Sequence, residues 1–260
     1  MLTHPNPYQM IAQSDHNQIL LVQAPGGCYI VKRLQTSANQ QARLMLSQEV
    51  RALQALRHPA IPSFLGQPSP TELAISFIQG ETLGAYLRRN GPLPWQQACS
   101  IALNLTRILV NIHWQKWLHR DIKPSNILLT GTGHSVALID FGNAIQIGTL
   151  PFLSPLRYNG TRGYAAPEQY EGSGYRGAHK AQTDFFSLGV VLHQMLTGHN
   201  PRSLPVSLLF DFPPVEQLAP FSPPILVQLV EALLQRDLSQ RPSGLVVQQY
   251  LERLLYGSTL

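Results

Sequence analysis

The first third of the chain alternates short apolar runs with polar turns, a pattern typical of β-strands. Residues 19–22 and 29–34 are β-prone runs on either side of a Pro-Gly-Gly turn, which predicts a β-hairpin. Residues 73–78 form a further strand-like run. Between these runs, residues 39–56 carry apolar side chains at helical spacing and end at a His-Pro pair, because the residue before proline disfavours the helical region. We therefore expect strands with one helix among them.

The rest of the chain is mainly helical in pattern. Residues 95–114 place apolar side chains every three or four positions, which is one face of a helix. Residues 127–129 and 136–139 are apolar runs around a Gly-Thr-Gly turn and predict a second hairpin. The last third alternates helical segments with proline-rich loops at 201–205 and 213–224. A β-rich beginning followed by a helical remainder predicts an α+β fold.

Composition narrows the class of protein. Hydrophobic residues make up 44% of the 260 residues and charged residues 13%, so the chain is expected to fold rather than stay disordered. The net charge of +5 comes from few acids and not from a basic block, and there is no zinc-ligand spacing or helix-turn-helix signature. Nucleic acid is therefore not an expected partner.

The lack of a recognisable targeting signal and the cysteine pattern predict a cytoplasmic protein. The first residues are polar and do not form a signal peptide, and the apolar stretch 185–196 is too short and too polar for membrane insertion. The two cysteines, Cys28 and Cys99, form no CxxC motif and are expected to be reduced, buried thiols.

Two strings carry the chemistry. Residues 119–126 read H-R-D-I-K-P-S-N, and residues 140–142 read D-F-G. Asp121 can act as a base, and Lys123 can neutralise developing charge. Asn126 and Asp140 offer hard oxygen ligands for Mg²⁺. These parts together are what phosphoryl transfer needs, whereas either string alone is common in surface loops and turns.

The two strings resemble the H-R-D-x-x-x-x-N and D-F-G motifs of eukaryotic-type (Hanks-type) serine/threonine protein kinases, including their small bacterial members. Three further segments are similar to that family: 160–168 to G-T-x-x-Y-x-A-P-E, 184–189 to D-x-W-S-x-G and 237–242 to D-P-x-x-R-P. The likeness covers residues 8–256. It implies one kinase domain over 1–260, with a bilobal fold.

In that fold a small β-rich N-lobe spans about 8–78 and a larger helical C-lobe spans 79–256. The resemblance assigns Lys32 to the α- and β-phosphates of ATP, with Glu49 as its ion-pair partner. Asp184 is expected to anchor the catalytic loop. Arg241 is expected to pair with Glu168 in the interior.

The implied nucleotide site departs from the family in two places. The family's three phosphate-loop glycines are replaced by Ala12, Ser14 and Asn17, and Ile30 stands where alanine usually faces the adenine. The implied nucleotide-contacting residues are Ala12, Ser14, Asn17, Ile19, Ile30, Lys32, Ser76, Ile78 and Leu128. Because glycine lets backbone N–H groups approach phosphates, these changes keep open a pseudokinase or nucleotide-binding scaffold with weak or no turnover.

The resemblance implies transfer of the γ-phosphoryl group of ATP, with Mg²⁺ or Mn²⁺, to a protein acceptor. Lys123 in D-x-K-x-x-N goes with serine or threonine acceptors. Thr161 is expected to contact the base, and Arg120 to pair with a phosphate on the activation loop, with Thr149 or Ser154 as the phosphorylated residue. A small-molecule phosphotransferase of the same fold is a further alternative, although such enzymes typically lack the A-P-E segment. The oligomeric state is left open by the sequence.

Overall fold

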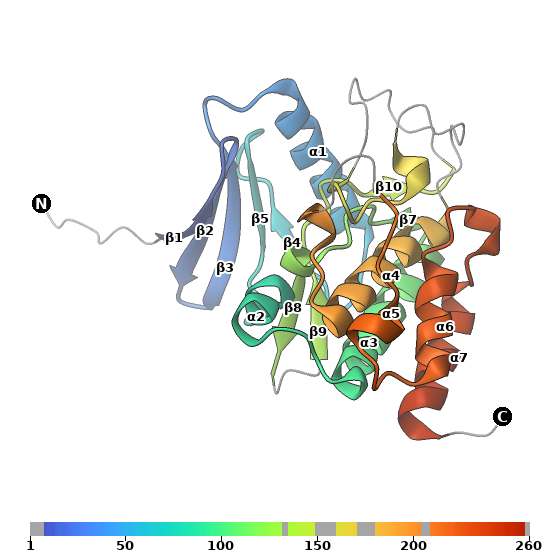
Figure 1. Cartoon of the computed structure of the whole chain (residues 1–260). Helices are drawn as coiled ribbons and strands as arrows, with labels where there is room; N and C mark the ends of the chain where they lie inside the picture. The colour runs from blue at the N-terminus through green and yellow to red at the C-terminus, as the bar shows by residue number, and fades with distance from the viewer. Residues whose placement is uncertain (1–7, 132–134, 149–159, 171–179, 204–208, 258–260) are drawn as a thin grey trace, which may run out of the picture.

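The computed structural model describes residues 8–131, 135–148, 160–170, 180–203 and 209–257. A five-stranded antiparallel sheet forms one end of the molecule and a larger helical part forms the other (Figure 1). The bilobal α+β kinase fold expected from the sequence is thereby confirmed.

The N-lobe consists of one sheet and one helix. The sheet order is β1-β2-β3-β5-β4, with β1 (Tyr8–Gln13), β2 (Asn17–Ala24), β3 (Gly27–Leu34), β4 (Phe64–Gly66) and β5 (Glu72–Ser76). Successive residues of β3 face opposite sides, so Ile30 and Leu34 join the main core while Val31 joins a small cluster on the other face. Lys32 shares the parity of Ile30 and extends toward α1 (Gln40–Ala55), where it meets Glu49.

The C-lobe is built around hairpins and long helices. Its strands are β6 (Glu81–Thr82), β7 (Trp117–Leu118), β8 (Ile127–Thr130), β9 (Ser135–Leu138) and β10 (Ile145–Gln146). Its α-helices are α2 (Leu83–Asn90), α3 (Trp95–Trp114), α4 (Ala181–Thr197), α5 (Val215–Leu218), α6 (Pro224–Leu233) and α7 (Gly244–Tyr256). Single 3₁₀ turns are η1 (Pro124–Asn126), η2 (Pro167–Gln169), η3 (Pro201–Ser203) and η5 (Leu238–Gln240).

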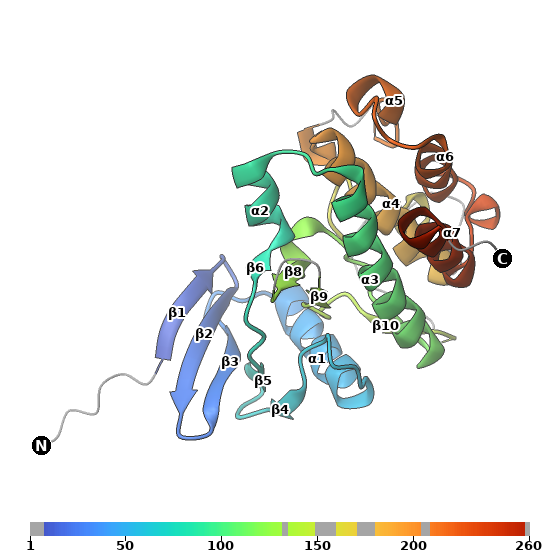
Figure 2. The same cartoon turned by 90° about the horizontal axis from the view of Figure 1, so that it is seen from below.

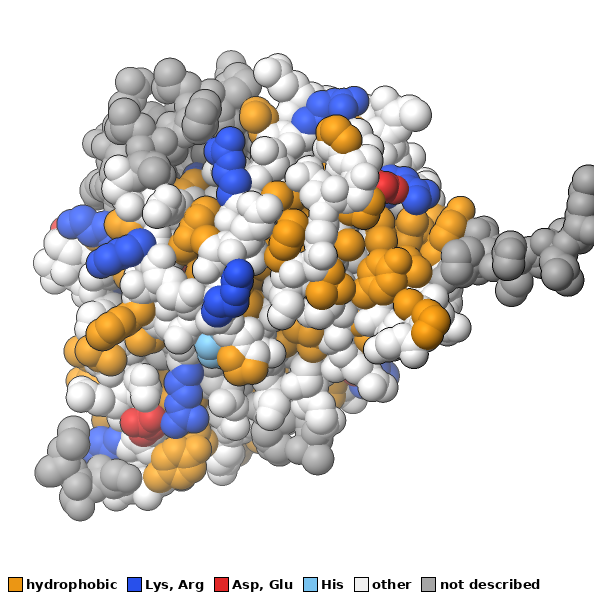
Figure 3. Space-filling model, turned by 180° about the vertical axis from the view of Figure 1, so that it is seen from behind, with side chains coloured by type: hydrophobic (Ala, Val, Ile, Leu, Met, Phe, Trp, Pro, Cys, Tyr) orange, Lys and Arg blue, Asp and Glu red, His pale blue; other side chains and the backbone are white. Residues whose placement is uncertain are grey.

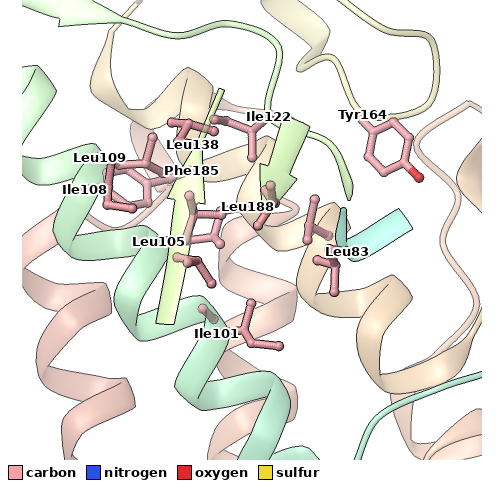
Figure 4. Close-up of a cluster of buried hydrophobic side chains, with 14 of the residues drawn as sticks. Leu83, Ile101, Leu105, Ile108, Leu109, Ile122, Leu138, Tyr164, Phe185 and Leu188 are labelled. Carbon is pink, nitrogen blue, oxygen red and sulfur yellow. The ribbon is translucent and has the colours of Figure 1, made fainter. Parts of the chain in front are cut away.

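Helices α3 and α4 form the centre of the C-lobe. Leu105 and Leu109 of α3 lie in one apolar cluster with Leu138 of β9 and Phe185 of α4 (Figure 4). Helix α7 packs along α3 (Figure 2). The catalytic string leaves α3 through β7 and enters β8, so both of its ends are fixed in a close-packed core.

Most of the expected elements are present. The hairpin of β2 and β3, the helices α1 and α3, and the hairpin of β8 and β9 lie at the predicted positions. Strands β1 and β4 were not predicted, and the proline-rich segment 213–224 contains the short helix α5. The prediction of two buried thiols is half wrong: Cys99 is buried, but Cys28 is exposed beside the β2–β3 turn.

Two further observations concern the surface and the helices. On the face shown in Figure 3, lysine and arginine side chains are scattered and do not gather into one patch. No helix in the described part of the chain is long and apolar enough to cross a membrane.

One buried ion pair joins the segment before α4 to the loop before α7. Arg241 donates from Nη1 and Nη2 to the two carboxylate oxygens of Glu168, over 2.7 and 2.8 Å. The side chains of Arg241 and Glu168 are 0% and 1% exposed. The guanidinium also donates to the carbonyls of Gln182, Gln235 and Arg236. The sequence-based prediction of this pair is therefore confirmed.

We predict that Arg241→Met lowers the free energy of unfolding by about 3–5 kcal/mol, because it leaves the Glu168 carboxylate buried without its partner. Urea unfolding followed by circular dichroism measures the change. Arg236→Met is the matched control, since Arg236 pairs with Asp211 through side chains that are 62% and 53% exposed. An exposed pair contributes about 0–1 kcal/mol. Equal losses for the two variants would contradict the structural role of the buried pair.

Candidate active site

The catalytic loop is held by one buried carboxylate. Asp184, in the first turn of α4, accepts hydrogen bonds from the backbone N–H groups of His119 at 2.9 Å and Arg120 at 2.7 Å. His113 of α3 contacts the same carboxylate through Nε2 at 2.8 Å. Burial opposes ionisation of Asp184, but these hydrogen bonds outweigh burial and lower the pKa of the carboxyl.

This anchoring imposes a strained backbone. Arg120 has φ 65°, a left-handed conformation that costs a residue other than glycine about 1–3 kcal/mol. Its carbonyl accepts a hydrogen bond from Gln169 Nε2 at 2.9 Å. Gly160 lies against the same carbonyl, and a Cβ there would come within 3.0 Å of it. The fold therefore fixes this loop from several directions.

His119, the first residue of the catalytic loop, packs against the D-F-G segment. Burial lowers the pKa of its ring. Its Nδ1 accepts from the N–H of Asp121 at 3.2 Å, so the proton lies on Nε2, which donates to the Ile139 carbonyl at 3.2 Å. The ring meets Phe141 edge to face, with centroids 4.7 Å apart. His119 thus couples the catalytic loop to the D-F-G segment.

The candidate base is oriented by three side chains. The Asp121 Oδ1 accepts from the Thr161 hydroxyl at 2.7 Å. Its Oδ2 accepts from Lys123 Nζ at 2.7 Å and from Asn126 Nδ2 at 3.2 Å. Lys123 also donates to the Thr161 oxygen at 2.7 Å. The expected contact between Thr161 and the base is therefore present, and three side chains fix the orientation of the carboxylate.

The two expected metal ligands have suitable oxygens. Asn126 also donates from Nδ2 to the Asp121 carbonyl at 2.9 Å, which leaves its amide oxygen without a partner among the described residues. Asp140 has φ 68° and uses Oδ1 to bind Lys32 at 3.1 Å. An amide oxygen and a carboxylate are hard donors that fit Mg²⁺ or Mn²⁺.

Lys32 joins the two lobes through a pair of carboxylates. Its Nζ lies 2.5 Å from Glu49 of α1 and 3.1 Å from Asp140. Burial disfavours the charged amine, but the two carboxylates outweigh burial and raise its pKa. Glu49 also accepts from the N–H of Phe141 at 3.3 Å. The Lys32–Glu49 pair predicted from the sequence is confirmed. Glu49 also connects α1 to the D-F-G segment.

The same cluster shifts the two acids in opposite directions. Burial raises the pKa of Glu49, and Lys32 offsets only part of that effect. Lys32 is the main cause that lowers the pKa of Asp140 to about 2, although burial opposes the shift. The Asp140 side chain is 39% exposed, so solvent screens this interaction and its contribution to stability is modest.

The turn expected to be the phosphate loop forms without glycine. It is the turn between β1 and β2, closed by the N–H of Ser14 on the Asn17 carbonyl at 2.8 Å and by the N–H of Asn17 on the Ser14 hydroxyl at 3.1 Å. Among the described residues other than glycine, positive φ occurs only at Lys116, Arg120, Asp140 and Phe210, so the turn needs no left-handed residue. The segment after β3 braces the turn, since Ser37 donates to the Asp15 carbonyl at 2.9 Å.

A cavity of about 250 Å³ brings part of the expected nucleotide site together. Its lining includes Ala12, Ser14, Asn17, Ile19, Lys32, Glu49 and Asp140. The other four expected nucleotide contacts do not line this cavity. Ile30 and Leu128 are buried at 8% and 9% exposure, and Ile78 is half-buried. The Ser76 hydroxyl accepts from the Ser63 N–H at 2.8 Å, so this side chain faces β4.

Sequence reasoning missed His113 and Gln169. His113 is the second-to-last residue of α3, and its partner Asp184 follows 71 positions later. Gln169 directly follows the A-P-E string. For Gln169 the signal was a polar residue next to a motif, and for His113 it was a histidine at the end of an apolar helical pattern.

The buried side chain of Arg120 has polar atoms that make no hydrogen bond within the described residues. It is 3% exposed, and its Nε and Nη2 atoms have no hydrogen-bond partner in the described part of the chain. Burial lowers its pKa to about 10. The predicted phosphorylation positions Thr149 and Ser154 lie outside the described residues, so the proposed phosphate partner of Arg120 stays a prediction.

The pKa of Asp140 gives a test of the lobe-joining cluster. Because its folded-state pKa of about 2 lies below the ordinary value, ionised Asp140 stabilises the fold above about pH 4, and this stabilisation is lost as the pH falls toward 2. We predict that the stability difference between the wild type and Asp140→Asn shrinks over that range. In a Lys32→Met background the pH dependence should disappear.

Urea unfolding at several pH values measures this cycle. Lys116→Met is the matched control, since Lys116 is an exposed lysine outside the cluster. A pH dependence that persists in Lys32→Met, or that Lys116→Met also removes, would contradict the assignment.

Comparison with known proteins gives the family. Residues 20–254 match the protein kinase domain family. The serine/threonine-protein kinase PknA of Mycobacterium tuberculosis is 32% identical over 207 residues, which cover 74% of this chain and 46% of that protein. The serine/threonine-protein kinase cds1 of Schizosaccharomyces pombe is 31% identical over 221 residues, 83% of this chain and 45% of that protein.

PrkC, a serine/threonine-protein kinase of Bacillus subtilis, is 31% identical over 156 residues, 59% of this chain and 23% of that protein. The chain thus spans about half or less of the length of these curated relatives. With the family match covering most of the sequence, and with the catalytic loop, the D-F-G segment and the Lys32–Glu49 pair in place, the chain belongs to the protein kinase domain family.

Proposed function

We propose that this chain is an ATP-dependent serine/threonine protein kinase. The observation that carries the proposal is the orientation of Asp121 by Thr161, Lys123 and Asn126, in a site where Lys32 already contacts Glu49 and Asp140. Phosphoryl transfer depends mainly on positioning and charge stabilisation, and this site supplies both.

In this proposal Asp121 accepts the proton of the attacking hydroxyl while its oxygen bonds to the γ-phosphorus of ATP and the bond from that phosphorus to the β–γ bridging oxygen breaks, which releases ADP. Lys123, already hydrogen-bonded to that carboxylate, is placed to stabilise negative charge on the transferring group. Lys32 binds the α- and β-phosphates, and Glu49 holds Lys32 in place. Asn126 and Asp140 would hold Mg²⁺ or Mn²⁺, which neutralises phosphate charge when bound.

Two observations support a serine or threonine acceptor on a protein. The Thr161 hydroxyl connects the segment before A-P-E to both Asp121 and Lys123, so the base and the expected peptide platform are rigidly linked. The relatives that cover most of this chain are named serine/threonine-protein kinases.

The family match covers residues 20–254, and we propose that the kinase domain spans residues 1–260. We also propose a cytoplasmic location, supported by the two free cysteines.

The alternative of a scaffold with weak or no turnover rests on Ala12, Ser14, Asn17 and Ile30. The braced turn between β1 and β2 supports the catalytic proposal, because the phosphate loop is closed without glycine. The bulk of Ile30 would affect binding of the adenine ring and not the groups proposed to transfer the phosphoryl group. Activity and nucleotide binding must therefore be measured separately.

We predict that Asp121→Asn lowers the rate of phosphate transfer at least about 100-fold, because the substituted amide cannot accept the hydroxyl proton. Transfer from labelled ATP to myelin basic protein, with Mg²⁺ or Mn²⁺, measures this. A thermal-shift titration with Mg·ATP should give similar stabilisation for the variant and the wild type. A wild-type protein that binds Mg·ATP but transfers no more phosphate than Asp121→Asn would favour the scaffold.

A further inference from the structure

A second pocket, of about 370 Å³, adjoins the candidate base. It lies between α2, the catalytic loop, the 161–164 segment and the end of α4. Lys123 and Thr161 line it, and both contact the Asp121 carboxylate. A group bound in this pocket would therefore sit next to the acceptor hydroxyl.

The charged side chains that line this pocket are all positive. Arg88, Lys123 and Arg202 line it, and no aspartate or glutamate does. Lys123 is already engaged by Asp121 and Thr161. Arg88 and Arg202 are exposed and form no ion pair within the described residues. Their positive charge is thus available to a ligand.

Two other arginines, by contrast, are paired with carboxylates. Arg89, next to Arg88 on α2, forms a two-pronged pair with Glu81, in which Nη2 donates to Oε2 over 2.8 Å. Arg236 pairs with Asp211. Of the 14 acidic residues in the sequence, only Glu171 lies outside the described residues, so few carboxylates are left that could neutralise the pocket.

Small and uncharged residues keep the pocket open between the two arginines. A Cβ added at Gly84 would lie 3.5 Å from the backbone of Pro124 and Ser125 and 3.6 Å from Arg88 Nη1. The guanidinium of Arg88 is therefore close to the catalytic loop. On the other side, the Tyr164 hydroxyl donates to Gln194 at 2.6 Å, and the charge of Arg202 acts on Tyr164.

We propose that this pocket selects acceptor proteins whose serine or threonine is flanked by negatively charged side chains, either carboxylates or phosphorylated residues. The proposal rests on the protein kinase function proposed above and specifies its substrate class. Guanidinium groups bind carboxylate and phosphate through charge-assisted hydrogen bonds. A basic flank would be repelled by the same two arginines.

Peptides with one serine acceptor test the proposal. The flanking residues are Asp, phosphoserine, Gln or Arg, and kcat/KM is measured for each peptide with the full chain. We expect the Asp or phosphoserine peptide to exceed the Gln peptide by about threefold or more per favourable contact, the scale of a well-placed exposed ion pair. The preference should fall at high ionic strength.

Arg88→Gln and Arg202→Gln should each reduce this preference, mainly through KM. Arg253→Gln, an exposed arginine on α7, is the matched control and should leave the ratio unchanged. A gain with phosphoserine alone supports the pocket and identifies phosphate as its ligand. Equal kcat/KM for all flanks, a preference for Arg flanks, or a ratio that neither pocket variant changes would overturn the proposal.

Binding separates this inference from the kinase function itself. Fluorescence anisotropy with peptides that carry alanine at the acceptor position needs no turnover. Preferential binding of the acidic peptide, lost in Arg88→Gln, supports the pocket even if no peptide is phosphorylated, and in that case only the proposed function fails. Equal binding of all peptides together with equal transfer rates overturns the substrate class and leaves the proposed function intact.

Discussion

The carboxylate of Asp184 sets the geometry on which the candidate site depends. It is fully buried, so it must be satisfied by hydrogen bonds, and it takes them from His113 and from the backbone of His119 and Arg120. Those bonds hold Arg120 in a left-handed conformation that the chain would otherwise avoid. The next residue is Asp121, so this anchoring also fixes the backbone that carries the candidate base.

The same principle recurs at two other buried acids. Glu49 joins α1 to β3 and to the D-F-G segment, and Glu168 joins the A-P-E segment to the loop before α7. In each case a buried charge has partners from elements that are distant in sequence. Misplacement of any of these elements would leave a charge unpaired. Of these contacts, those of Glu49 with Phe141 and of Lys32 with Asp140 connect the two lobes.

Elements with strong periodicity could be predicted from the sequence. Helix α3 was predicted at its observed bounds because its apolar face is regular, and the hairpin of β2 and β3 was predicted from its Pro-Gly-Gly turn. Strand β1 was not predicted because its residues, YQMIAQ, do not alternate regularly between apolar and polar, and all six are exposed in the structure. The Lys32–Glu49 pair followed from family resemblance, whereas the role of His113 needed the position of α4. The pocket of Arg88 and Arg202 joins residues 114 positions apart, which no local pattern can reveal.

We infer that the buried charge of Asp184 holds the catalytic loop in its observed conformation before any nucleotide binds. Hydrogen exchange of the backbone amides of His119 and Arg120, in the nucleotide-free protein, tests this most directly. The account predicts strong protection of both amides in the wild type and much faster exchange in Asp184→Asn under conditions where that variant is still folded. Rapid exchange of both amides in the wild type, or equal protection in the two proteins, would contradict it.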